Sequence, residues 1–230
     1  MELQAMDKII ILGTAHTINT PGKCSPDKKF REYEYSRRVA NATKKGLEAR
    51  GVTVLIDMPE ANGSGNQSAE LKKRVAYVNN ICAKYGAGKC AYISIHVNAA
   101  GADGKWHNAA GFCIFTTKGQ NNSDKLATCI HEVAQEELKK YSHLVVQGKK
   151  TGAYSAKQVG VRADYSDGDP DLEANFYVIR HTACPSVLSE NMFQDTKADV
   201  EWLLSDEGFN AIVDIHVNGI LKWIEKYGTK

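Results

Sequence analysis

The sequence contains no long hydrophobic run and no segment that resembles a secretory signal. The first apolar run, from Ile9 to Leu12, is too short for a signal-peptide core, and the residues before it lack a basic cluster. No later segment approaches the length needed to span a bilayer. We therefore expect synthesis in the cytoplasm without a signal peptide, and no transmembrane segment.

Paired cysteines and excess charge are also missing. The six cysteines form no Cys-x-x-Cys pair, so their spacing predicts neither a structural zinc knuckle nor a disulfide framework. We expect free thiols, as in a reducing compartment. The formal net charge is only +2, from 29 basic and 27 acidic residues, which argues against a nucleic-acid partner. No repeat or basic tail indicates an appended binding module, and no oligomeric state is indicated.

What is present is enough apolar sequence for a large core. A chain of 230 residues with 43% hydrophobic residues fits one globular domain over residues 1–230. Short apolar runs alternate with amphipathic segments, giving the order strand, helix, strand, helix, strand over residues 8–96. This order predicts an α/β fold with right-handed crossovers and a mostly parallel sheet.

The individual elements follow from the same periodicities. Strands are predicted at residues 8–13, 52–57, 91–96, 111–116, 175–180 and 185–190, and helices at 32–50, 69–85, 124–141 and 205–227. Residues 60–68 are predicted to form a flexible loop. Residues 145–174 are polar and contain glycine, which indicates a long surface excursion of the kind that often lines a substrate cleft.

Three side chains able to bind a metal or move a proton follow predicted strands. They are His16, His96 and Glu190. The carboxyl ends of parallel strands meet at one edge of a sheet, where sites are commonly built. A histidine packed in the core explains His96 equally well when that residue is taken alone. Glu190 follows the apolar pair Val187 and Leu188, so its charge must be paired, hydrated or functional, and we favour a functional role.

The first turn of the predicted helix 32–50 carries Glu32 and Glu34. The helix dipole favours carboxylates at this end, so at least one of the two has a structural explanation. Residues two positions apart lie on roughly opposite faces of a helix, so only one of them can point into a site.

Together these residues resemble the zinc-dependent N-acetylmuramoyl-L-alanine amidases of type 3, which are peptidoglycan hydrolases. The resemblance covers nearly the whole chain and is carried by the strand before His16, Glu32 heading a helix that ends at Gly51, Arg74, Asn79, the block Ser94-Ile-His-Val-Asn-Ala99 and the block Pro185-Ser-Val-Leu-Ser-Glu190. It implies a single-domain α/β fold, phosphorylase/hydrolase-like, with a central mixed and mostly parallel sheet of about six strands flanked by helices.

The resemblance also implies a zinc site with a catalytic glutamate beside it. Matched by position, the metal ligands are His16, Glu32 and His96, and the catalytic residue is Glu190. Two histidines and one carboxylate suit an open catalytic zinc site, which keeps a coordination position for water. In such a site the metal activates water and polarises the substrate carbonyl, and a nearby carboxylate carries the proton.

Two local features bear on this assignment. Glu32 is preferred to Glu34 because its distance from Gly51 agrees with the helix of the family. His16 is flanked by Ala15 and Thr17, where the family usually has glycines, so we expect a different loop geometry there.

The implied reaction is hydrolysis of the amide bond between N-acetylmuramic acid and L-alanine in peptidoglycan. Asn98 is a candidate to orient a ligand or the substrate, and Arg162 or Arg180 to meet carboxylates of the stem peptide. Without an export signal, a phage or prophage endolysin that reaches the cell wall after release is the role we expect. The alternatives are a zinc peptidase acting on another peptide or amide bond and a non-catalytic wall-binding protein.

The other histidines and the cysteines near the candidate segments are assigned no direct role. His107 is predicted in a loop, His131 and His216 within helices, and His143 after a helix end. His181 lies close in sequence to the Glu190 strand and is the one of these we consider as a neighbour that tunes the site. Cys24 and Cys184 would need a lowered pKa to be reactive.

Overall fold

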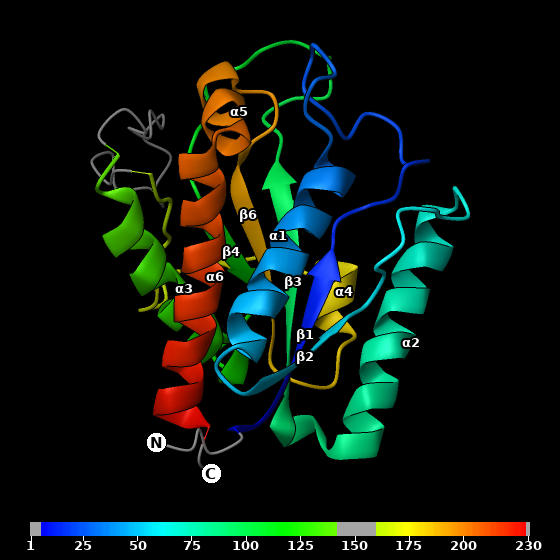
Figure 1. The fold of residues 1–230 in the computed structure, drawn as a ribbon, viewed down its shortest axis with the longest axis vertical. Coiled ribbons are helices and arrows are strands. Elements are labelled where there is room, and N and C mark those ends of the chain that lie inside the picture. Colours follow the sequence, from blue (N-terminus) through cyan, green and yellow to red (C-terminus); the bar gives the residue numbers. More distant parts are fainter. Residues whose placement is uncertain (1–5, 142–159, 229–230) are drawn as a thin grey trace.

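A six-stranded sheet with helices on both faces forms the centre of the computed structural model, which describes residues 6–141 and 160–228 (Figure 1). The strands are β1 (Met6–Thr14), β2 (Val52–Ile56), β3 (Cys90–Asn98), β4 (Cys113–Thr116), β5 (Leu172–Glu173) and β6 (Ser186–Phe193). The helices are α1 (Glu32–Glu48), α2 (Gln67–Tyr85), α3 (Asn122–Leu138), α4 (Tyr177–Arg180), α5 (Lys197–Leu204) and α6 (Asp206–Tyr227), with a 3-10 turn η1 (Ala87–Lys89) before β3.

The sheet has the strand order β2-β1-β3-β6-β4-β5. The first four of these strands run parallel, β4 runs antiparallel to β6, and β5 runs parallel to β4. The prediction of an α/β fold with a mixed, mostly parallel sheet of about six strands flanked by helices is therefore confirmed. Each parallel connection crosses over through a helix, as parallel neighbours require.

Both faces of the central strands are buried, which explains their continuous apolar sequences. In β3, Ile93 and Ile95 face a large cluster formed with α1, α3 and α6, whereas Tyr92 faces a smaller cluster that includes residues of α2 and α4. Figure 1 shows α1, α3 and α6 in front of the sheet and α4 behind it. Residues at even positions in β3, His96 among them, therefore face the side of α2 and α4.

Two predictions of local structure were wrong, and one helix was missed. Residues 175–180 contain the helix α4 and not a strand, since Val178 and Ile179 are buried together while Phe176 remains 39% exposed. An apolar run this short does not distinguish the two structures by its period. The strand β6 continues past Glu190 to Phe193, so Glu190 lies within it rather than at its end. The helix α5 was not predicted.

The predicted loops are shorter than expected. Of the excursion at residues 145–174, residues 145–159 lie outside the described residues, as does His143. The remainder joins the sheet, because Leu172–Glu173 forms β5 and Val161 bridges to Phe112. The loop at 60–68 ends early, because α2 begins at Gln67 after an N-cap supplied by Asn66. Within the described residues, none of the helices is both long and apolar enough to cross a membrane.

Acid should destabilise the fold partly through His131 in α3. This residue is 1% exposed, its Nε2 has no hydrogen-bond partner, and burial lowers its pKa from 6.5 to about 4. The unfolded chain binds the proton first, so the free energy of unfolding should fall as pH drops from 6.5 towards 4, by on the order of 2 kcal/mol for this group. Urea unfolding at pH 7 and pH 4.5 should show a smaller loss for His131→Leu than for wild type. Equal losses would contradict this assignment.

Candidate functional site

Three side chains far apart in the sequence meet at the carboxyl end of the parallel strands. His96 lies in β3, His16 follows β1, and Glu32 is the first residue of α1. Glu32 Oε1 lies 3.0 Å from His96 Nδ1, and Glu32 Oε2 lies 3.4 Å from His16 Nε2. One ligand atom from each residue lies within 4.8 Å of the other two. This spacing suits a single metal ion, which would sit about 2.0–2.2 Å from each ligand.

Glu32 is held in place by further contacts at the head of α1. Its side chain is almost completely buried, the backbone N–H of Val97 donates to Oε1 at 3.1 Å, and Gln194 Nε2 donates to Oε2 at 3.4 Å. Burial alone would raise the pKa of Glu32, but the hydrogen bond with His96 and the interaction with His16 outweigh it and lower the pKa. The carboxylate is therefore ionised and available as a ligand.

The loop at His16 has an unusual backbone conformation. His16 itself adopts a φ of 43°, in the left-handed region that few residues other than glycine occupy. Two buried arginines hold its backbone carbonyl, with Arg37 Nη2 donating at 3.0 Å and Arg74 Nη2 at 3.2 Å. Burial lowers the pKa of His16 to about 4, so the imidazole is neutral and keeps a lone pair for a metal at neutral pH.

Glu34 points away from these residues. Its side chain is exposed, and its Oε1 accepts a hydrogen bond of 2.7 Å from the hydroxyl of Tyr33. The helix-face argument therefore separates the two glutamates in the structure, with Glu32 at the cluster and Glu34 outside it.

Glu190 lies beside His96 in the sheet. The two residues are register partners on the parallel strands β3 and β6, so their side chains share one face. Glu190 is half-buried and its Oε2 has no hydrogen-bond partner. Burial, followed by repulsion from Glu32, raises the pKa of Glu190 well above its usual range. A carboxyl group with this environment can hold a proton near neutral pH.

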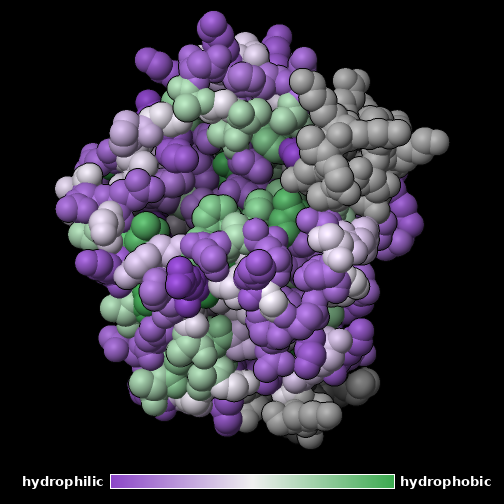
Figure 2. Space-filling model, turned by 180° about the vertical axis from the view of Figure 1, so that it is seen from behind, coloured by the Kyte–Doolittle hydropathy of each residue, from purple (hydrophilic) through white to green (hydrophobic). Residues whose placement is uncertain are grey.

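The four residues line one cleft of about 340 Å³. Its other walls are formed by residues of the loop after β1, of α2 and of α4, and by the end of β6; they include Lys23, Leu71, Asn98, Phe176, Tyr177 and Gln194. The molecular surface on the side of α4 is hollowed in its upper half, where apolar and hydrophilic residues are mixed (Figure 2).

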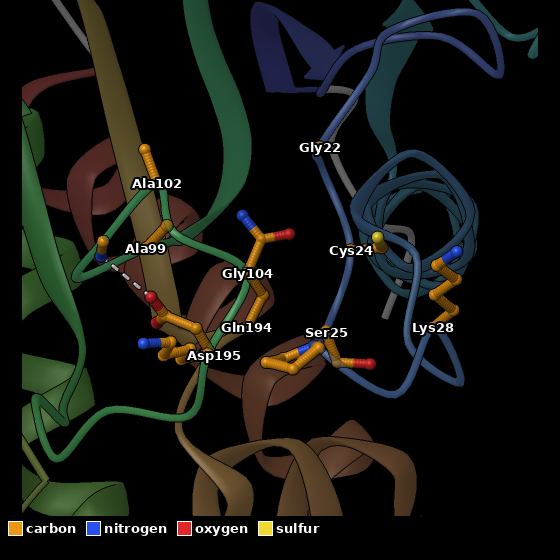
Figure 3. A pocket seen from close by; sticks show the side chains of 12 residues that line it. Gly22, Cys24, Ser25, Lys28, Ala99, Ala102, Gly104, Gln194 and Asp195 are labelled. Carbon is orange, nitrogen blue, oxygen red and sulfur yellow. Dashed lines mark hydrogen bonds between the residues drawn. The ribbon is translucent and has the colours of Figure 1, made fainter.

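A second hollow of about 240 Å³ shares Ala99 and Gln194 with this cleft. Figure 3 shows residues 22–28 on one side of it and the loop after β3, with Gln194 and Asp195, on the other. Asp195 fixes the loop by accepting hydrogen bonds from the backbone N–H groups of Ala100 and Gly101. The cleft and this hollow are therefore neighbours.

The model of the amidase type 3 family, described as N-acetylmuramoyl-L-alanine amidase, matches residues 10–222. The chain belongs to this family. It is 27% identical over 175 residues to the N-acetylmuramoyl-L-alanine amidase CwlM of Bacillus licheniformis, a match that covers 76% of this chain and 52% of that protein. The chain thus spans about half the length of this curated relative.

Solved amidase structures share the fold of this family member. The catalytic domain of CwlV from Bacillus (Paenibacillus) polymyxa var. colistinus is 18% identical with a TM-score of 0.70, and the match covers 95% of this chain and 98% of that domain. The CwlD amidase of Clostridioides difficile is also 18% identical, with a TM-score of 0.70 and coverage of 95% and 99%. At these identities the likeness concerns the fold.

Of the predicted substrate-binding residues in this amidase family member, only Asn98 lines the cleft. The Arg162 guanidinium lies 5.1 Å from the centre of the Phe193 ring, and Arg180 is exposed at the end of α4. The structure therefore does not bring these two arginines to the cleft.

The other described histidines do not line the cleft, whereas Cys24 lines the second hollow. His107 contacts Asp103, His216 is buried against Ser189 on the opposite face of the sheet, and His181 packs its ring against Tyr177. Cys24 and Cys184 are free, and burial raises the pKa of the Cys184 thiol above its usual range.

Sequence reasoning missed several residues that shape the site. Arg37 is the residue that the sequence could most readily have indicated, because it lies one turn after Tyr33 on the buried face of α1. A buried arginine needs several hydrogen-bond acceptors. Its Nη1 donates to the carbonyls of Ala15 and Tyr33. Lys23 and Gln194 lie in polar loops that carry no such signal.

Proposed function

We propose that this chain is a zinc-dependent N-acetylmuramoyl-L-alanine amidase that hydrolyses the bond between N-acetylmuramic acid and L-alanine in peptidoglycan. The observation that supports this most directly is the convergence of His16, Glu32, His96 and Glu190 on one cleft in a member of the amidase type 3 family. The activity of the whole protein and its cell-wall substrate are part of this proposal.

The donor set fits a catalytic zinc ion. His16 has a lowered pKa and is neutral, Glu32 is ionised, and His96 contacts the same carboxylate, so the ligand atoms match the preferences of zinc in charge and in kind. Structural zinc sites use a closed set of four ligands, mostly cysteines, and no cysteine contributes to this cluster of described residues. When bound, zinc would supply a water of lowered pKa and polarise the substrate carbonyl.

Glu190 carries the proton in the proposed reaction. Its free Oε2 accepts a proton from the attacking water, and the carboxyl group formed in this way keeps that proton until the amide bond breaks. The proton then goes to the departing nitrogen of L-alanine, because an amine anion is too poor a leaving group. The carboxylate is regenerated for the next turnover.

The walls of the cleft suit a peptide substituent on a polymer. The half-exposed rings of Phe176 and Tyr177 offer apolar contact on one side, and the Lys23 ammonium offers a positive charge for carboxylates of the stem peptide. The hollow between residues 22–28 and the loop after β3 extends the surface along the edge of the sheet. We assign it to the substrate beyond the scissile bond.

Chelation should abolish the release of stem peptides from purified peptidoglycan, and added zinc should restore it. Products would be identified by mass spectrometry, and zinc content would be measured on the same samples. The amidase releases peptides with a new L-alanine amino terminus. Peptides with other amino termini would indicate a peptidase instead, and zinc-bound protein that releases nothing would contradict the substrate assignment.

A further inference from the structure

A second group of carboxylates lies away from the cleft. Asp124, Asp169 and Asp171 each place one carboxylate oxygen within 4.8 Å of the other two. Asp171 immediately precedes β5, Asp124 lies in the first turn of α3, and Thr116 at the end of β4 donates a hydrogen bond to Asp171. Because β4 runs antiparallel to β6, the end of β4 lies beside the start of β6. The group therefore lies towards the opposite end of the strands from Glu190.

Two buried carboxylate oxygens in this group have only each other's carboxyl group as a neighbour. Asp171 is 2% exposed; its Oδ2 accepts the hydrogen bond from Thr116, and its Oδ1 has no donor other than the carboxyl group of Asp169. Asp169 accepts a hydrogen bond from Gln120 at Oδ2, and its Oδ1 is also buried without a further donor. Two acceptor oxygens repel each other, so this contact needs either a shared proton or a cation between the carboxyl groups.

The hydrogen bonds described for the group come from uncharged donors, namely the Thr116 hydroxyl, the Gln120 amide and the backbone N–H of Asn121. Lys125, the nearest lysine in sequence to Asp124, contacts Asn122 and the Tyr227 ring instead. Burial, and then a hydrogen bond between its carboxyl group and that of Asp169, raise the pKa of Asp171 to about 8.

We propose that Asp124, Asp169 and Asp171 bind a calcium ion that fastens the β4–β5 edge of the sheet to the start of α3. All the donors are oxygens, which favours a hard cation over zinc. A triangle of oxygens with sides of up to 4.8 Å accommodates ligand distances of about 2.3–2.6 Å. A hollow lined by Gln120, Asn121, Asp124 and Asp169 gives water access to complete the coordination.

The sequence of the loop supports this assignment. Residues 164–171 read Asp-Tyr-Ser-Asp-Gly-Asp-Pro-Asp, with Gly168 in the left-handed region at a φ of 106°. Alternating acidic residues around a glycine turn bring several carboxylates to one point, as calcium-binding loops do. The Asp124 carboxylate also accepts the backbone N–H of Asn121 in a capping box, which fixes its orientation towards the loop.

Titration of zinc-loaded protein with CaCl₂ tests the proposal. We expect one calcium ion per chain by calorimetry, and a rise in the thermal midpoint of roughly 5–10 °C at a hundredfold excess over the dissociation constant. The zinc content should not change. An absence of both heat and thermal shift in wild type would overturn the proposal, and an equal response to MgCl₂ would overturn the choice of calcium.

Matched variants locate the site. Asp169→Asn and Asp171→Asn should each weaken calcium binding at least about tenfold, whereas Asp164→Asn, in the same loop but outside the group, should retain it. The His16→Ala variant should lose zinc and keep the calcium response. Loss of the calcium response in the His16→Ala variant would overturn the assignment. So would a calcium response that survives both Asp169→Asn and Asp171→Asn. Zinc content confirms that each aspartate variant is folded.

Discussion

Replacing Glu190 with glutamine should lower the rate of stem-peptide release from peptidoglycan by about 10²–10⁴-fold. Glutamine has nearly the same size and shape, but it cannot take a proton from water and return it to the L-alanine nitrogen. Because Glu190 contacts none of the three proposed ligands through a hydrogen bond, the variant should bind zinc as wild type does. The raised pKa also means that removing this carboxyl group should not destabilise the fold.

The measurement is the initial rate of release by mass spectrometry, with zinc content and the thermal midpoint recorded for each variant. Glu34→Gln is the matched control, because Glu34 is an exposed glutamate near the site whose side chain accepts a hydrogen bond from Tyr33 rather than from a residue of the cleft. It should keep wild-type activity. If Glu190→Gln retains full activity with zinc bound, another residue carries the proton and the role assigned to Glu190 is wrong.

Local patterns were sufficient to predict the central part of the fold. The runs around Ile10 and Ile93 are apolar and β-branched, and the helices that follow β1 and β2 have clear 3.6-residue periods, so the parallel core and the positions of His16 and His96 could be predicted. The run at residues 175–180 was too short for a period to decide, and there the helix α4 forms because its apolar side chains pack against the sheet.

The site needed information that no local pattern carries. The prediction that Glu190 ends a strand was wrong, yet the parallel register places it beside His96. The strand continues past it through an irregularity at Met192, whose φ is 65°, and such a feature has no sequence signature here. The choice of Glu32 came from the resemblance to a family. The helix-face argument showed only that Glu32 and Glu34 could not both point into a site.

Behind the site lies a buried ion pair that supports the loop of His16. Arg74 Nη1 lies 2.7 Å from Asp57 Oδ1, and the two side chains are 5% and 0% exposed. Asp57 Oδ2 accepts a hydrogen bond of 2.9 Å from Tyr92, and its Oδ1 accepts one from the backbone N–H of Thr14. Since Arg74 also donates to the carbonyl of His16, this network connects the stability of the sheet to the geometry of a proposed zinc ligand.

Replacing Arg74 with leucine should lower the free energy of unfolding by about 3–5 kcal/mol, because it leaves the Asp57 carboxylate buried without its partner. Urea unfolding would measure the loss. The exposed pair of Lys197 and Glu201, 3.7 Å apart, provides the control, and Lys197→Ala should cost less than about 1 kcal/mol. Adding Asp57→Asn to Arg74→Leu should recover part of the loss, since the uncompensated charge is gone. A loss for Arg74→Leu as small as that of the control would mean that Asp57 is neutral or hydrated in the folded protein.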